Sequence, residues 1–192
     1  MIVVDIESTG LDPDRCSILS IWAINFNYPE KKFYQECKIF ENALVEEKAL
    51  EVNWFTYEQI TNENKKSEPQ LISDFVNRLT QFEDKTIAWQ HPMALDIPII
   101  KAACKRAGIN YELSQRTVDL HSIAYSHFIS WQKGIPLDEN WTSNIKLDYI
   151  ASYLGIWEEP KPHNALNWAK YEAECFARLL YWKNLLEEFK DT

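Results

Sequence analysis

A short apolar run at the start of the chain constrains the fold most, because it carries two acidic residues at its end. Residues 2–10 read IVVDIESTG, and the residues around Asp5 are almost all Ile or Val. A nearly continuous β-branched run predicts a strand that is buried on both faces. Residues i and i+2 of a strand point to the same side. We therefore expect Asp5 and Glu7 to project together from the end of a buried strand.

The order of the later segments predicts an α/β protein. Residues 17–27 and 31–40 read as two strands of an antiparallel hairpin, with a turn at 28–30. Short helices are expected between residues 42 and 64. The remaining segments alternate between helix and strand: helix 67–82, strand 85–90, helix 94–108, strand 116–120, and helices 120–130, 146–154 and 164–189. This order predicts a five-stranded mixed sheet with helices on both faces, in a single domain over residues 1–192.

Composition limits the partners and the compartment. The net charge of −9 argues against a protein that coats duplex DNA, since such binding needs many Lys and Arg residues. It does not exclude an enzyme that holds one strand end through metal ions. The four cysteines form no C-x-x-C pair, which is typical of reduced thiols. No apolar stretch is long enough to span a bilayer, and the start of the chain has no signal-like region. We therefore expect a cytoplasmic protein that does not contact membranes.

Two later residues extend the acidic pattern, although each has an ordinary structural interpretation. Asp96 begins an amphipathic helix after a buried strand, where ligands bind in α/β sheets; an acidic residue in a first helical turn is also favoured by the helix dipole. His163 lies in a proline-flanked loop before the last helix, a type of segment that often carries function. Asp119 reads as a helix-start carboxylate, and His121 and His127 have no metal-ligand context in the sequence.

Taken in order, these motifs resemble those of the DEDDh 3′–5′ exonucleases. The chain reads DIESTGLD, then an Asp after AWQHP, then LDYIASYLGI followed by PHNAL. The family includes proofreading exonucleases, ribonuclease T and oligoribonuclease. The resemblance covers nearly the whole chain and implies a ribonuclease H-like fold.

The resemblance implies a metal-dependent hydrolase that releases nucleoside 5′-monophosphates from the 3′ end of single-stranded DNA or RNA. Two divalent ions about 4 Å apart would activate water and stabilise both the attacking and the leaving oxygen. Oxygen ligands suit Mg²⁺ or Mn²⁺. By similarity, Asp5 would bridge the ions, Glu7 would bind the ion on the nucleophile side and Asp96 would bind the other. His163 would act as the general base.

The turn after the first strand is the substrate-binding segment that the resemblance implies. Thr9 and Gly10 match the family's turn against the 3′-terminal nucleotide, with backbone contacts from Thr9 to the sugar. Leu11 would be an apolar wedge against the last base. Such contacts tolerate every base and therefore bind single strands with little sequence preference. Several relatives act as dimers, so a homodimer is a further expectation.

The sequence departs from the family pattern at the fourth carboxylate, an Asp five residues after the catalytic His. That position is Trp168 in this chain. Trp168 could be a core residue, a stacking surface for a base or an engineered change. Glu172 lies one turn further along the same helix face and is the candidate replacement ligand; the competing interpretation is a solvated helix residue, which is the commoner situation for Glu. The alternative function is a catalytically impaired domain that binds nucleic-acid ends or a protein partner.

Overall fold

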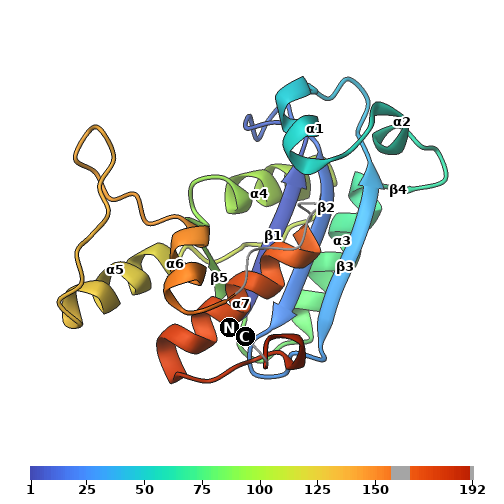
Figure 1. Ribbon diagram of the computed structural model, residues 1–192. Helices are drawn as coiled ribbons and strands as arrows, with labels where there is room; N and C mark the ends of the chain where they lie inside the picture. The colour runs from blue at the N-terminus through green and yellow to red at the C-terminus, as the bar shows by residue number, and fades with distance from the viewer. Residues whose placement is uncertain (157–164, 191–192) are drawn as a thin grey trace.

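The computed structural model describes residues 1–156 and 165–190 and has the predicted α/β architecture (Figure 1). The strands are β1 (Ile2–Ser8), β2 (Ile18–Asn25), β3 (Lys32–Lys38), β4 (Lys66–Ser67), β5 (Ile87–Trp89) and β6 (Val118–Asp119). The helices are α1 (Glu47–Asn53), α2 (Tyr57–Ile60), α3 (Glu68–Thr80), α4 (Asp96–Arg106), α5 (Leu120–Ser130), α6 (Leu147–Tyr153), α7 (Ala165–Tyr181) and the 3₁₀ helix η1 (Glu187–Phe189).

The strands form one mixed sheet in the order β4-β3-β2-β1-β5-β6. β1, β2 and β3 pair antiparallel, with the β2–β3 hairpin at the predicted turn. β5 runs parallel to β1, and β6 runs parallel to β5. The carboxyl ends of β1, β5 and β6 therefore meet at one edge of the sheet, where α/β proteins bind ligands.

Helices cover both faces of the sheet (Figure 1). Alternate residues of β1 enter two different cores: Ile2, Val4 and Ile6 pack with α3 and α4, whereas Val3 packs with α5, α6 and α7. This alternation confirms that β1 is buried on both faces. It also puts the odd-numbered residues of β1, including Asp5 and Glu7, on the face that α7 covers.

Two details of the predicted fold are wrong. The sheet has six strands rather than five, because β4, of two residues, pairs with the end of β3; a segment this short carries no alternation pattern that could predict it. The last long helix ends at Tyr181 rather than near 189, because Trp182 has a left-handed backbone (φ 54°).

The four cysteines are free and buried. Within the described ranges, no helix is both long and apolar enough to cross a membrane.

Candidate active site

The end of β1 carries the first two carboxylates of the site. Asp5 is buried, and Glu7 is half-buried one pleat further along the same face. Both line a cavity of about 160 Å³ together with Val52 and Asn53 of α1, and with Trp168 of α7. The Asn53 side chain donates a hydrogen bond to the Ser8 carbonyl oxygen (2.8 Å), which attaches α1 to the end of β1.

Asp96 adds a third carboxylate from the neighbouring part of the sheet edge. It is the first residue of α4, which follows β5 after a short loop, and its side chain is buried. Burial raises the pKa of Asp96 to about 7, although backbone hydrogen bonds from Asp96 itself and from Ile6 favour the charged form. Ile6 has the same kind of contact with Asp5. The backbone of one residue of β1 therefore lies against both carboxylates.

Glu172 is the fourth carboxylate, and its position excludes the solvated interpretation. Its relative exposure is 1%, so it is a buried residue of α7. Burial and the nearby charge of Asp96 raise its pKa well above the usual range. The backbone N–H of Gln90, directly after β5, donates to Glu172 Oε2 (3.1 Å). An unpaired acidic residue is rarely this buried, so the location is a specific feature of the site.

The charges of these residues act on one another. Burial, followed by the charges of Glu7, Asp96 and Glu172, raises the pKa of Asp5 well above its usual range. Asp5 Oδ2 is fully buried and has no hydrogen-bond partner among the described residues. Several buried carboxylates can be ionised together only if cations compensate their charge. The oxygen donors and the unsatisfied Asp5 oxygen fit one or more hard divalent cations.

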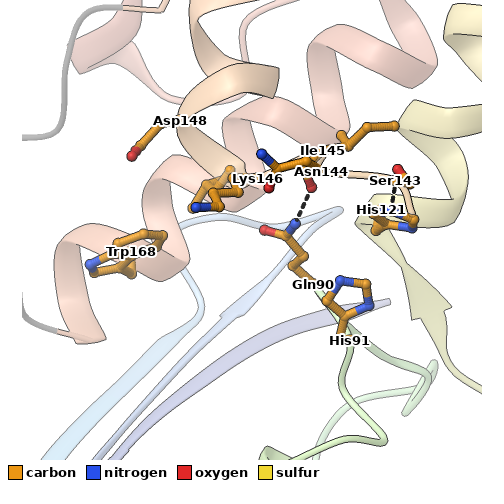
Figure 2. Close-up of a pocket in the computed structure, with 10 residues that line it drawn as sticks. Gln90, His91, His121, Ser143, Asn144, Ile145, Lys146, Asp148 and Trp168 are labelled. Carbon is orange, nitrogen blue, oxygen red and sulfur yellow. Dashed lines mark hydrogen bonds between the residues drawn. The ribbon is translucent and has the colours of Figure 1, made fainter. Parts of the chain in front are cut away.

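Trp168 lies one turn before Glu172 on α7 and separates two cavities. It lines the small cavity at Asp5 and Glu7 and also a larger one of about 430 Å³. Figure 2 shows the larger cavity, with Trp168 at one end and His91 and His121 at the other. Trp168 is half-buried, so it is not a fully buried core residue.

The turn after β1 follows the strand as the sequence predicts, and internal hydrogen bonds hold Thr9 in it. Thr9 is fully buried; its N–H donates to Ser17, and its carbonyl oxygen accepts from Glu46. The contact from Thr9 to a substrate sugar therefore stays a prediction. Gly10 permits a close approach, since a Cβ atom there would lie 2.8 Å from Sγ of the buried Cys16. Leu11 is 68% exposed and free to contact a base.

A buried ion pair holds this turn against the body of the protein. Arg106 of α4 donates to both carboxylate oxygens of Glu68 (2.9 and 3.0 Å) and to the Pro13 carbonyl oxygen (2.8 Å). Glu68 also accepts hydrogen bonds from Ser17 Oγ and the Ile18 N–H. The turn is thus fixed at the sheet edge next to the carboxylates.

One predicted residue lies outside the described residues, and one cluster was missed. His163 belongs to the segment 157–164, so its role stays a prediction. His91, Asp119 and His121 come together at the ends of β5 and β6, with one ligand atom of each within 4.8 Å of the others. The sequence shows no metal-ligand spacing for them, because only the pairing of β5 with β6 brings them together.

With this geometry established, comparison with known proteins identifies the family. The model of the RNase_T family, described as exonuclease, matches residues 2–176. The chain belongs to this exonuclease family. No curated protein sequence matches the chain at a significant level.

Solved structures share the exonuclease fold at low sequence identity. The nuclease domain of 3′hExo, a DEDDh family member bound to rAMP, has a TM-score of 0.68 and 17% identity, with coverage of 97% of this chain and 94% of that domain. Cell-death related nuclease 4 (CRN-4) has a TM-score of 0.73 at 12% identity. The match covers 95% of this chain and 64% of CRN-4. E. coli Exonuclease I in complex with a dA16 oligonucleotide has a TM-score of 0.72 at 15% identity. The match covers 95% of this chain but only 40% of Exonuclease I. At these identities the likeness shows the ribonuclease H-like fold.

Proposed function

We propose that the chain is a metal-dependent 3′–5′ exonuclease that removes nucleoside 5′-monophosphates from the 3′ end of single-stranded DNA or RNA. The observation that carries this proposal is the cluster of buried carboxylates at the sheet edge. Asp5, Asp96 and Glu172 come from three different elements, and each has a raised pKa. Folding such a cluster is unfavourable unless it binds cations, so a cation-dependent reaction is the best explanation for it. One sheet with a core on each face also supports a single exonuclease-like domain over residues 1–192.

In this proposal, Asp5, Glu7, Asp96 and Glu172 hold two divalent ions, either Mg²⁺ or Mn²⁺. The bound ions would supply a water of lowered pKa and stabilise charge on the leaving oxygen. The charges of Glu7, Asp96 and Glu172 all act on Asp5. This supports the role of Asp5 as the ligand that bridges the two ions. Glu172 takes the task of the Asp that Trp168 replaces. Its longer side chain starts one turn further along α7.

The protein's other residues position the substrate. The exposed Leu11 would pack against the terminal base, and Gly10 allows the turn that carries it to pack closely against Cys16. His163, two residues before the start of α7 in the sequence, would accept the proton of the attacking water. The alternative of an impaired domain rests on the missing fourth carboxylate, and the burial of Glu172 beside Asp96 supports the active enzyme instead.

A degradation assay with a matched pair of variants tests the proposal. Single-stranded DNA and RNA oligonucleotides labelled at the 5′ end would be incubated with the protein in Mg²⁺ or Mn²⁺. We expect stepwise shortening from the 3′ end and release of 5′-monophosphates. Asp5→Asn keeps the side-chain shape and should abolish the activity, whereas Asp138→Asn, at an exposed loop carboxylate, should not change it. If Asp5→Asn is as active as the unmodified protein, the proposal is wrong.

A further inference from the structure

We propose that His91, Asp119 and His121 form a second metal site, separate from the carboxylate cluster, that binds a transition-metal ion such as Zn²⁺. The three residues provide two imidazoles and one carboxylate at the ends of two adjacent parallel strands. This donor set suits Zn²⁺ far better than Mg²⁺, which prefers oxygen ligands. None of the three residues belongs to the carboxylate cluster, although the charge of Asp119 contributes to the raised pKa of Glu172.

The distances are close to those that an ion requires. The ligand atoms lie within 4.8 Å of one another, and His91 Nδ1 is 3.8 Å from Asp119 Oδ1. Zn–N bonds of about 2.1 Å in tetrahedral geometry place two ligand atoms about 3.4 Å apart. The His91 side chain is 52% exposed, so its ring has room to turn toward Asp119 without repacking the core.

Neighbouring residues hold the ligands in place, as supporting partners do in metal sites. Asp119 accepts hydrogen bonds from the backbone N–H groups of His91 (2.8 Å), His121 (3.2 Å) and Ser122 (3.2 Å). Ser143 Oγ is 3.0 Å from His121 Nε2, a contact drawn in Figure 2. His91 has a left-handed backbone (φ 62°), a conformation that is uncommon outside glycine. The ring centroids of His91 and His121 lie 4.8 Å apart.

The cluster also has an open side. Both histidines line the cavity of about 430 Å³, next to Lys146 and Asn144 (Figure 2). Three protein ligands and one accessible position are the arrangement of zinc sites that bind water or an anionic ligand. An ion here would therefore have a route of entry and a free coordination position that faces the cavity.

Zinc binding to the purified chain, in excess Mg²⁺ and without nucleic acid, tests the site. We would measure Zn²⁺ affinity by competition with a chromophoric chelator for the unmodified protein, His91→Asn, His121→Gln and His127→Gln. Asn tolerates the left-handed backbone at position 91. His127, whose Nε2 contacts the Tyr153 hydroxyl 3.1 Å away, provides the matched control outside the cluster.

We expect one Zn²⁺ per chain that Mg²⁺ does not displace. His91→Asn and His121→Gln should each weaken binding at least about tenfold, and His127→Gln should leave it unchanged. Imidazole ¹⁵N resonances of His91 and His121 should shift on binding, while those of His127 stay fixed. If the affinity is the same in His91→Asn and His121→Gln as in the unmodified protein, the ion binds elsewhere, for example at the carboxylates, and the proposal is wrong.

Discussion

The backbone N–H of Gln90 donates a hydrogen bond to Glu172, 3.1 Å from nitrogen to Oε2. This bond joins the end of β5 to α7 and directs a buried carboxylate toward Asp96, whose charge raises the pKa of Glu172. It connects residues that are 82 positions apart in the chain. Glu172 thus occupies a defined position, one turn after Trp168, where we expect the family's fourth carboxylate.

The first prediction concerns Glu172 as a metal ligand. Glu172→Gln keeps the shape and the hydrogen bond from Gln90 but removes the charge. We expect the Mn²⁺-dependent exonuclease rate to fall more than about 100-fold, because loss of an outer-shell partner alone costs about 10- to 100-fold and Glu172 is proposed as a direct ligand. Trp168→Asp restores the usual carboxylate position, so Trp168→Asp combined with Glu172→Gln should recover most of the rate. Equal rates for Glu172→Gln and the unmodified protein would show that Glu172 is not used.

The pH dependence of stability follows from the raised pKa of Asp96. The raised pKa lets the folded protein hold the Asp96 proton up to about pH 7, whereas the unfolded chain loses it near the ordinary pKa of 3.8. Without metal, the contribution of Asp96 to the free energy of unfolding should therefore be greatest below about pH 4 and fall between about pH 4 and 7. The pKa difference of about three units at Asp96 corresponds to a loss of about 4 kcal/mol in the free energy of unfolding, at about 1.36 kcal/mol per pKa unit.

Urea denaturation in EDTA at several pH values measures this effect. Asp96→Asn cannot ionise, so its stability should fall less over the same range and exceed that of the unmodified protein at neutral pH, while its nuclease activity is lost. Mn²⁺ should raise the melting temperature more at about pH 8 than at about pH 5, because the ions bind ionised carboxylates. A stability that rises from pH 4 to 7 for the unmodified protein, and equally for Asp96→Asn, would contradict the assignment.

Much of the site could be predicted from the sequence because its residues lie at recognisable element ends. The alternation of β1 predicts that Asp5 and Glu7 share a face, and Asp96 does begin α4. The burial of Glu172 could not be predicted, since the sequence around it does not show that Gln90 and Asp96 lie against that face of α7. The same limit applies to β4, which is too short to have a pattern.

The buried pair of Arg106 and Glu68 predicts a large effect on stability. Arg106→Ala removes two hydrogen bonds to Glu68, whose side chain is only 1% exposed, and leaves its charge unpaired. We expect a loss of about 3–5 kcal/mol in the free energy of unfolding. Lys105→Ala, at the exposed neighbouring position on α4, should cost under about 1 kcal/mol. Similar losses for the two variants in urea denaturation would be evidence against this role of the pair.

Leu11 provides a test of substrate contact that is separate from folding. Because its side chain is 68% exposed, Leu11→Ala should leave the melting temperature unchanged. Loss of a contact to the terminal base should raise KM for single-stranded substrates about tenfold. A contact with a base contributes about 1–3 kcal/mol, and the lower part of this range corresponds to a tenfold change in affinity. Leu137→Ala, at another exposed leucine, is the control. An unchanged KM for Leu11→Ala would place the substrate elsewhere.

The most direct test of the carboxylate cluster is to locate its ions. Crystals grown with Mn²⁺ and a nucleoside 5′-monophosphate would be measured at the manganese absorption edge. We predict two anomalous peaks about 4 Å apart, ligated by Asp5, Glu7, Asp96 and Glu172, and the loss or weakening of one peak in Glu172→Gln. Peaks that do not contact Asp5, or two undiminished peaks in Glu172→Gln, would contradict this account of the site.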